Sequence, residues 1–411
     1  MDRITKYLGI LFIASLPLYV IRWSFFGYPT TFLELLFFLF LVSYLLQKRK
    51  EKKFHFHLPV LLIGGILVVS ATISLFVSPD FLGGLGIWKA YFIEPFIFFI
   101  CLYDYISCKP QESRLFFWAY VFSGVWVGLY ALYQWFTGSN PFAPHEAQLG
   151  RVSAVYNTAN AIGLYYGPIL SLLMGALIRT PKKAFVPILL SVFFLLVLVL
   201  TKSRGTFLGL LALEVFMLFS YVNRMFPAKR VLIRGIVSVL IIATVVGSIF
   251  FLQSKQKEAH SVTSTYRGSD TFLVRTIVWE TSYRMIKDNP ILGVGLDGFR
   301  ERYLIDYRPS FVLEDFQYPH NLILTLWLET GILGVLSFLF LLIFVTQMIL
   351  KKDQDFLGWG ITGGFLYLFV HGLVDVPYFK NDLSMAFWLL IAFATSYPKI
   401  RDYYENDDKN L

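Results

Sequence analysis

The stretch LPVLLIGGILVVSATISLFV, residues 58–77, is an unbroken apolar run without a charged residue. A helix of roughly 20 apolar residues crosses the hydrocarbon core of a bilayer, and in lipid each backbone donor and acceptor must be satisfied within the segment. The run is continuous rather than alternating at every second residue, which argues against a strand of an outer-membrane barrel. The stretch therefore predicts a transmembrane helix.

Similar runs recur along the whole chain of 411 residues, of which 56% are hydrophobic and only 15% are charged. This composition excludes an ordinary soluble domain. The runs give candidate spans at 4–21, 31–46, 58–77, 88–106, 114–136, 160–178, 184–200, 204–222, 234–252, 320–350, 356–375 and 382–397. We therefore expect an all-α integral membrane protein with about twelve transmembrane helices. The first run lacks a small-residue cleavage pattern after it, so we expect it to be retained as a span.

The positive charges predict the orientation, because short cytoplasmic loops carry an excess of Lys and Arg. With the amino terminus in the cytoplasm, 21 of the 36 basic residues lie inside and 15 lie outside. Nine of those 15 belong to the segment 253–318, and segments of that length follow the charge rule poorly. Without that segment, 21 basic residues lie on the cytoplasmic side and 6 on the external side. We expect both termini in the cytoplasm. The net charge of +9 reflects these loops rather than a nucleic-acid partner.

Two predicted external segments stand out by their length. The first, 137–159, ends in a polar stretch that includes Arg151, and the second, 253–319, contains the sequence TFLVRTIVWETSYRMIK at 271–287. Its apolar spacing predicts a helix along the membrane surface, which Asn289-Pro290 ends. The expected organisation is spans one to nine in 1–252, the external segment in 253–319, spans ten to twelve in 320–400, and a cytoplasmic tail in 401–411. The tail is polar, so we expect disorder.

The most distinctive motif is DNPILGVGLDGF at 288–299, which is followed by YPHNLILTLWLETGILG at 318–334. Together with KSRG at 202–205, and with Arg275 and Trp279 in the long loop, these motifs resemble the O-antigen ligase and polymerase family of bacterial glycosyltransferases. The resemblance covers about 200–334 by motif and the rest of the chain by topology. It implies a glycosyltransferase-C-like fold in the bacterial inner membrane. It also implies one long external loop between helices nine and ten, and an active site at the periplasmic or exterior face.

Arg204 and Arg275 are the cationic candidates for catalysis. Arg204 lies at the external end of an apolar helix, where a guanidinium is costly to bury unless it pairs with an anion. The alternatives are an anchor that reaches a lipid headgroup for Arg204, and an ordinary charge on a surface helix for Arg275. The resemblance favours a site role for both residues. Planar guanidinium groups bind pyrophosphate with paired donors, which suits the leaving group of a donor linked to polyprenyl pyrophosphate.

His320 is the third catalytic candidate, and Asn321 beside it is a candidate for substrate binding. They lie at the start of span ten, where unpaired amides and the positive helix end favour phosphate. Many interfacial histidines are structural, because the ring tolerates both phases. The resemblance favours function instead. The imidazole could accept the proton of an acceptor hydroxyl, or bind a donor phosphate when protonated, and the sequence leaves both roles open.

Three further candidates for substrate binding lie in spans ten and eleven. Glu329 follows His320 by nine residues, roughly 13 Å along a helix. A carboxylate at that depth is expensive, and an internal structural partner is favoured over catalysis. His371 and Asp375 share one helix face at spacing i,i+4 near the external end of span eleven. They could orient substrate or form a structural pair.

Two more candidates for substrate binding precede these in the chain. Asn160 ends the sequence Asn-Thr-Ala-Asn, which is similar to one that opens the sixth span of the family, although a helix cap explains it equally well. Lys89, in span four, could contact phosphate, with Glu94 as its counter-charge.

No metal site or cofactor is expected. His55 and His57 lie in a cytoplasmic loop with no carboxylate or cysteine cluster near them in the sequence. The only cysteines, Cys101 and Cys108, fall in a span and a cytoplasmic loop, which argues against a disulfide framework or a zinc site. The first external loop, 22–31, contains no acidic residue to hold a cation. We therefore expect arginines to supply the positive charge for a metal-independent reaction.

The reaction that the resemblance implies is a single, inverting displacement. The donor is a glycan linked to polyprenyl pyrophosphate, and the acceptor is a hydroxyl of a glycolipid or another glycan. Ligase, repeat-unit polymerase and protein O-oligosaccharyltransferase activities share these motifs and remain open. The alternative from another class is a polysaccharide flippase or transporter, which would show related halves and broken helices at the bilayer midplane. The polar features of this chain gather at one face, which favours the enzyme.

Overall fold

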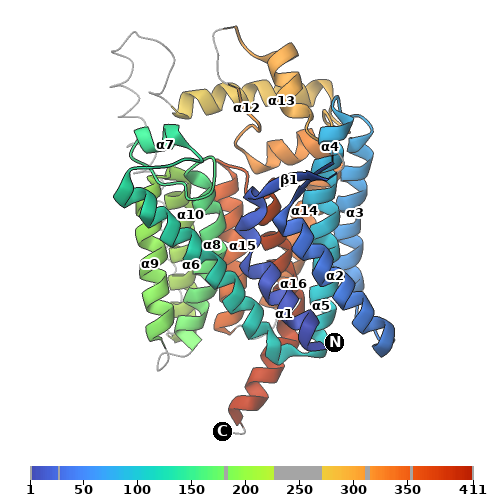
Figure 1. The fold of residues 1–411 in the computed structure, drawn as a ribbon, viewed down its shortest axis with the longest axis vertical. Helices are drawn as coiled ribbons and strands as arrows, with labels where there is room; N and C mark the ends of the chain where they lie inside the picture. Colours follow the sequence, from blue (N-terminus) through green and yellow to red (C-terminus); the bar gives the residue numbers. More distant parts are fainter. Residues whose placement is uncertain are drawn as a thin grey trace.

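The computed structural model describes residues 2–25, 28–179, 184–225, 271–310, 315–351 and 355–409. Helices form most of it, and they bundle side by side (Figure 1). Within these residues, seven helices are long and apolar enough to cross a membrane, and α9 (Phe185–Thr201) and α15 (Phe356–Gly372) are shorter apolar helices. The protein is therefore a polytopic, helical membrane protein, as predicted. The predicted span 234–252 lies outside the described residues.

The amino-terminal part contains a small hairpin that the sequence did not predict. The elements are α1 (Asp2–Ala14), the 3-10 turn η1 (Leu16–Val20), β1 (Arg22–Phe25), β2 (Tyr28–Thr31) and α2 (Phe32–Glu51). The two strands pair antiparallel, with Arg22 opposite Thr31. Four residues per strand are too few for an alternating pattern to separate a strand from a loop, which is why the sequence did not show this hairpin in an otherwise all-α chain. The side chain of Thr31 then accepts a hydrogen bond from the Glu34 amide and begins α2.

The middle of the chain continues the bundle. Its elements are α3 (Leu58–Leu75), α4 (Phe81–Ile87), the π-helical turn η2 (Trp88–Ile93), α5 (Glu94–Cys108), the 3-10 turn η3 (Pro110–Glu112), α6 (Ser113–Thr137), α7 (Pro144–Gln148), α8 (Asn160–Arg179), α9 and α10 (Arg204–Met225). The predicted fourth span therefore begins near 81 rather than 88. Pro95 has no amide hydrogen to donate to the carbonyl of Tyr91, and the Tyr378 hydroxyl donates to that carbonyl instead, at 2.7 Å.

The carboxyl-terminal part includes a broken helix. Its elements are α12 (Thr271–Asp288), α13 (Gly298–Arg302), the π-helical turn η6 (Tyr303–Tyr307), α14 (Leu322–Leu350), α15 and α16 (Asn381–Lys409). The predicted continuous span 320–350 is interrupted at Gly331, which has φ 72° and ψ −179°. Beyond the break, the Ile332 amide donates to the Ile291 carbonyl at 3.0 Å. Only glycine adopts this backbone readily, so the break depends on that residue.

Helix α16 lies at the centre of the bundle and continues further than predicted. Of its apolar window 89% is buried, against 44% for α3, and it packs against α5 and α14. The expected disorder of the tail is wrong for residues 401–409, which extend α16. Charge spacing explains this extension, because Arg401 pairs with Glu405 one turn later, at 3.3 Å.

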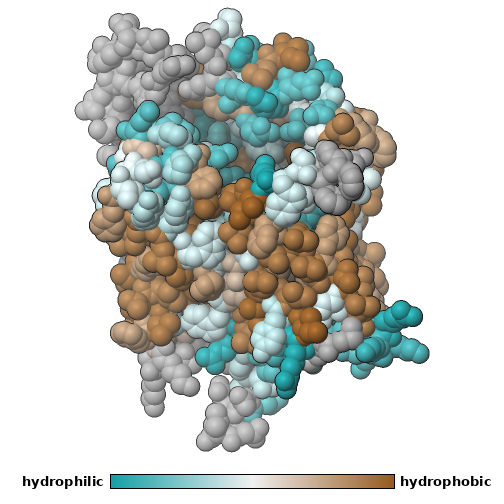
Figure 2. Space-filling model, viewed as in Figure 1, coloured by the Kyte–Doolittle hydropathy of each residue, from teal (hydrophilic) through white to brown (hydrophobic). Residues whose placement is uncertain are grey.

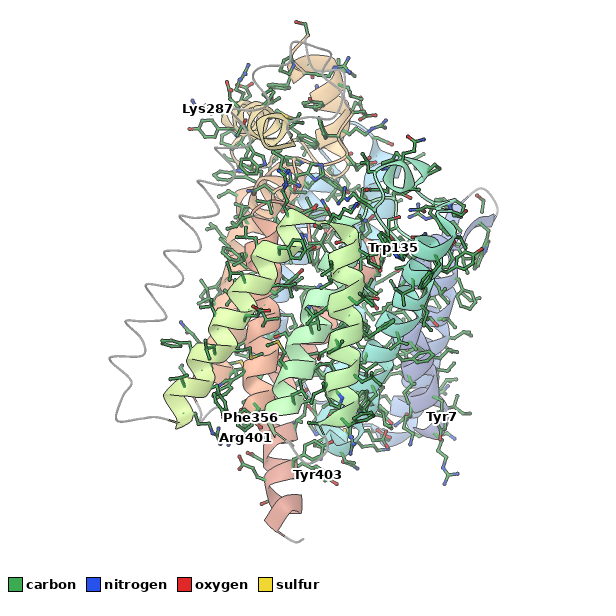
Figure 3. The ribbon with its side chains drawn as sticks, turned by 90° about the vertical axis from the view of Figure 1, so that its left-hand side faces the viewer. Tyr7, Trp135, Lys287, Phe356, Arg401 and Tyr403 are labelled. Atoms are coloured by element: carbon green, nitrogen blue, oxygen red, sulfur yellow. The ribbon has the colours of Figure 1, made fainter. Side chains whose placement is uncertain are left out.

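The two ends of the bundle differ. On the face shown in Figure 2, an apolar band crosses the middle of the molecule, with polar surface above and below it. Both termini lie at one end, whereas α12 and α13 cover the other (Figure 1). Lys287 marks the end with α12, and Arg401 and Tyr403 mark the end with the termini (Figure 3). We call these the α12 end and the termini end.

Candidate functional site

The segment 288–299, which carries the Gly-Val-Gly motif, is fixed to the broken helix α14. Glu329 is fully buried, and its carboxylate accepts hydrogen bonds from the amides of Asp297 at 2.6 Å and Phe299 at 3.4 Å. The Trp327 indole donates to the carbonyl of Pro290 at 2.8 Å. Glu329 thus has the internal structural partner that the sequence favoured, and its carboxylate faces this segment.

Helix α12 fixes the residue that precedes His320. The Trp279 indole donates to the carbonyl of Pro319 at 2.9 Å. His320 itself has φ 51°, in the left-handed region that non-glycine residues seldom adopt. Asn321 then begins α14, because its side chain accepts from the amides of Ile323 and Leu324, both at 3.0 Å. The backbone is therefore fixed on both sides of His320, by the Trp279 hydrogen bond before it and by the Asn321 helix cap after it.

Asn321 also brings the α15–α16 link to His320. Its side-chain amide donates to the carbonyl of Leu373 at 3.0 Å. Two residues later, Asp375 Oδ1 lies 3.5 Å from His320 Nδ1, an ion-pair contact that is longer than a good hydrogen bond. The His320 side chain is 36% exposed and that of Asp375 is 12% exposed, so the imidazole stays accessible while the carboxylate is covered.

A second set of contacts extends from Asp375 to an arginine. Asn160, the first residue of α8, donates to Asp375 Oδ2 at 2.9 Å and accepts from Arg151 at 3.0 Å. Arg151 also pairs with Glu146, at 3.0 Å, and donates to the carbonyl of Thr201 at 2.8 Å. Asn160 therefore bridges an anion and a cation.

Arg275 interacts electrostatically with this carboxylate and with two further guanidinium groups from separate segments. Burial lowers the pKa of Arg275, the charge of Asp375 opposes that effect, and the charges of Arg204 and Arg151 add to it. These four charges are therefore close enough to influence one another. In the described part of the chain, the side chains of Arg204 and Arg275 have no hydrogen bond and no ion pair. Among these five groups, the three guanidiniums exceed the two carboxylates of Asp375 and Glu146 by one positive charge, which favours an anion.

Asp375 remains ionised in this environment. Burial alone would raise the pKa of its carboxyl group, but His320, His371 and Arg275 outweigh burial and hold the pKa well below its usual value. A permanent negative charge therefore faces the imidazole of His320 across the neutral pH range.

His371 packs beneath the start of α10 rather than hydrogen-bonding Asp375. The ring is fully buried, and its Nδ1 lies 3.2 Å from the Tyr367 hydroxyl. Its Nε2 has no hydrogen-bond partner within the described residues. A Cβ atom at Gly205 would lie 2.8 Å from this ring, so the close approach requires glycine. His371 thus supports the turn that presents Arg204.

Lys89 is placed differently from the other candidates. Its ammonium group lies 2.6 Å from a carboxylate oxygen of Glu34, on α2. The expected counter-charge, Glu94, is therefore replaced by Glu34. No contact between Lys89 and His320 or Asp375 is recorded in the ranges that the structure covers.

Sequence reasoning missed two cations at this site, Arg151 and Lys380. The ammonium of Lys380 lies 5.4 Å from the centre of the Tyr156 ring. Burial lowers the pKa of Lys380, and the charges of Asp382 and Asp375 oppose that effect. A signal was available: only six basic residues lie on the predicted external side apart from the segment 253–318, and both missed residues are among them. Scarce cations on the predicted external side are candidates for anion binding.

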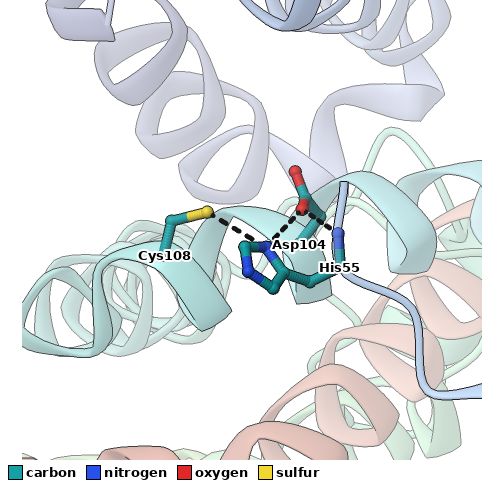
Figure 4. A group of neighbouring side chains, drawn as sticks. All are labelled: His55, Asp104 and Cys108. Carbon is teal, nitrogen blue, oxygen red and sulfur yellow. Dashed lines mark hydrogen bonds and ion pairs between the residues drawn. The ribbon is translucent and has the colours of Figure 1, made fainter. Parts of the chain in front are cut away.

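At the termini end, the fold gives His55 two neighbours that are distant from it in the sequence. A carboxylate and a thiol do lie near His55: its Nδ1 is 3.1 Å from Asp104 and 3.3 Å from Cys108 (Figure 4). Asp104 and Cys108 belong to α5, about fifty residues further along the chain. Only the packing of the α2–α3 link against α5 brings them together, so the local sequence could not show this cluster.

The fold and the α12 end define a polytopic membrane protein with a cationic cluster around an imidazole–carboxylate contact. Residues 189–339 match the family described as O-Antigen ligase, a family of glycosyltransferase-type enzymes. That match confirms the predicted resemblance over a segment that includes Arg204, Arg275 and His320.

Two curated proteins are similar to the chain. The O-antigen ligase of Salmonella typhimurium (strain LT2) is 27% identical over 172 residues, 40% of each chain. A provisionally named polysaccharide ligase of Rickettsia typhi is 27% identical over 158 residues, 37% of each chain. The chain thus matches about two fifths of the length of these relatives.

Proposed function

We propose that this chain is a glycosyltransferase of the O-antigen ligase type. It transfers a glycan from polyprenyl pyrophosphate to a hydroxyl group of a glycolipid or glycan, at the external face of the bacterial inner membrane. The observation that carries the proposal is the contact of His320 with Asp375, which Asn160 links to Arg151 and which interacts electrostatically with Arg275. The family match over 189–339 supports the same activity.

The arginines bind the pyrophosphate of the donor. Arg204 and Arg275 have guanidinium donors that no described residue occupies, and Arg151 adds a third positive charge. A guanidinium presents paired donors to phosphate oxygens and keeps its charge at any physiological pH. As the bond between the sugar and the diphosphate breaks, these charges stabilise the departing diphosphate, a role that a cation fills in metal-dependent transferases.

His320 acts on the acceptor. Its imidazole accepts the hydroxyl proton while the hydroxyl oxygen bonds to the anomeric carbon and the electron pair of the breaking bond goes to the diphosphate. Attack opposite the leaving group inverts the anomeric configuration. Asp375 faces Nδ1 at 3.5 Å, so it orients the ring and stabilises the imidazolium that forms. Nε2 is then the nitrogen that meets the acceptor.

The test is a transfer assay with purified protein, a lipid-linked glycan and a panel of acceptors. Wild-type protein forms the covalent product without added nucleotide, and His320→Ala lowers the rate by at least about 100-fold. His145→Ala is the matched control, because this exposed histidine also lies at the α12 end, on α7. Translocation of the lipid without product would favour the transporter, and a normal rate for His320→Ala would contradict the proposal. The productive acceptor distinguishes ligase, polymerase and protein glycosylation.

A further inference from the structure

The cluster at the termini end contains three atoms that commonly bind transition metals. His55 Nδ1, a carboxylate oxygen of Asp104 and Cys108 Sγ all lie within 4.8 Å of one another (Figure 4). Asp104 is fully buried, His55 is partly exposed and Cys108 is exposed. The group is therefore anchored on its carboxylate side and open to solvent on its thiol side, which provides an entry path.

Two of the three separations are close to those between ligands of one ion. Tetrahedral zinc binds nitrogen and oxygen at about 2.0–2.1 Å and sulfur at about 2.3 Å, so neighbouring ligand atoms are roughly 3.3–3.6 Å apart. The nitrogen–oxygen separation is 3.1 Å and the sulfur–nitrogen separation is 3.3 Å. A single ring nitrogen carries at most one proton, so His55 Nδ1 can donate to Asp104 or to Cys108 but not to both.

Lys48 shows that this location attracts a cation. Its ammonium lies 2.6 Å from Asp104, 3.7 Å from Cys108 Sγ and 3.0 Å from Glu51, and its side chain is 2% exposed. The carboxylate and the sulfur thus already face one positive charge. Glu51 gives Lys48 a second partner, so the ammonium can turn toward Glu51 and leave the other ligands free.

We propose that His55, Asp104 and Cys108 form a binding site for a divalent ion that prefers nitrogen and sulfur ligands, such as Zn²⁺, with water as the fourth ligand. Binding releases the Cys108 thiol proton to solvent, and the ion displaces Lys48 from Asp104 and Cys108. The ion joins the α2–α3 link to the end of α5. This site is at the opposite end of the bundle from His320 and does not depend on the proposed transferase activity.

Co²⁺ is the probe, because a cobalt–thiolate bond gives a charge-transfer band in the near ultraviolet. The full chain is purified in detergent, stripped with a chelator and titrated with Co²⁺, and Zn²⁺ is then added in competition. We expect one equivalent of Co²⁺ to produce the band, Zn²⁺ to abolish it, and Zn²⁺ to raise the Tm. Cys108→Ser and His55→Gln each remove the band. Cys101→Ser and His57→Gln are the matched controls, and both retain it.

A band that is absent from the wild type, or that persists in Cys108→Ser, would overturn the site. The His55→Gln variant preserves the test if the serine variant does not fold. Lys48→Met supplies an independent result: without the competing ammonium, Co²⁺ should bind about 10-fold more tightly. Unchanged or weaker binding in Lys48→Met would contradict the displacement of lysine by the ion.

Discussion

His320 combines an uncommon backbone with an accessible ring. Its left-handed conformation is held by the Trp279 indole on one side and by the Asn321 cap on the other. Such a conformation persists only where surrounding contacts determine it, and residues of this kind gather at functional sites. His320, which the motif at 318–334 indicated as a candidate, therefore also has a backbone conformation that the fold constrains.

Asp375→Asn tests the orienting role. Asparagine keeps the size of the side chain but removes the charge that faces Nδ1, and we expect the transfer rate to fall at least about 10-fold with little change in the KM for the donor. Initial rates at several donor concentrations measure this. Asp306→Asn, at an exposed residue of the same end, is the control and should match the wild type. Equal rates for Asp375→Asn and the wild type would refute the role.

The lowered pKa of Asp375 predicts how stability depends on pH. A carboxyl group whose pKa is depressed by folding stabilises the protein above its unfolded pKa of about 3.9, and loses this contribution only as the pH falls toward the lower folded value. The Tm difference between wild type and Asp375→Asn should therefore shrink as the pH falls from 5 to 3. Thermal unfolding in detergent measures it, and a difference that stays constant over this range would disagree.

Arg275→Lys separates charge from geometry. Lysine keeps the positive charge but lacks the planar fork that grips two phosphate oxygens, so the KM for the donor should rise about 10-fold. Arg302→Lys is the control, because that arginine pairs with Asp306 on the surface, at 3.2 Å. If both variants behave like the wild type, Arg275 does not bind the diphosphate through paired donors.

At the scale of elements, hydropathy predicted the helices because long apolar runs leave few alternatives in lipid. Hydropathy did not predict the irregular features within these helices. The break at Gly331 and the π-helical turn before Pro95 depend on partners that are distant in sequence, the Ile291 carbonyl and the Tyr378 hydroxyl. Local pattern carries no information about such partners.

Gly331→Ala tests the broken helix. The backbone at φ 72° and ψ −179° strains any residue with a Cβ, and that atom would lie 2.2 Å from the Ile291 carbonyl. We expect a loss of stability of about 1–3 kcal/mol, measured by thermal unfolding. Gly65→Ala is the control, since a Cβ there meets nothing within 4 Å. A Gly331→Ala variant as stable as the control would show that the break does not require glycine.

At the scale of the whole molecule, the sequence found part of the site and missed part. Motifs identified Arg204, Arg275 and His320, which fall in the matched segment. Arg151 and Lys380 lie outside it. Arg151 reaches the site through its hydrogen bond to Asn160, the first residue of α8, and Lys380 through the α15–α16 link, which Asn321 holds against α14. Long-range packing decides which basic residues lie close together. A single sequence therefore predicts the type of site better than it predicts every residue that belongs to it.

The orientation in the membrane is also a prediction at this scale. We expect the α12 end to face outward and the termini to face the cytoplasm. In a cysteine-free background, Lys287→Cys should react with an impermeant thiol reagent added to intact cells, whereas Tyr403→Cys should react only after lysis. The two positions mark opposite ends of the bundle (Figure 3). Labelling of Tyr403→Cys alone in intact cells would reverse the topology.

The central claim is that the cations at the α12 end bind the diphosphate of a lipid-linked donor. The most direct measurement is the affinity of purified protein for polyprenyl pyrophosphate, compared with the corresponding polyprenol. Wild-type protein should bind the pyrophosphate at least about 10-fold more tightly, and Arg204→Ala and Arg275→Ala should each remove most of that preference. Equal affinity for the two lipids, or a preference unchanged in both variants, would contradict the account.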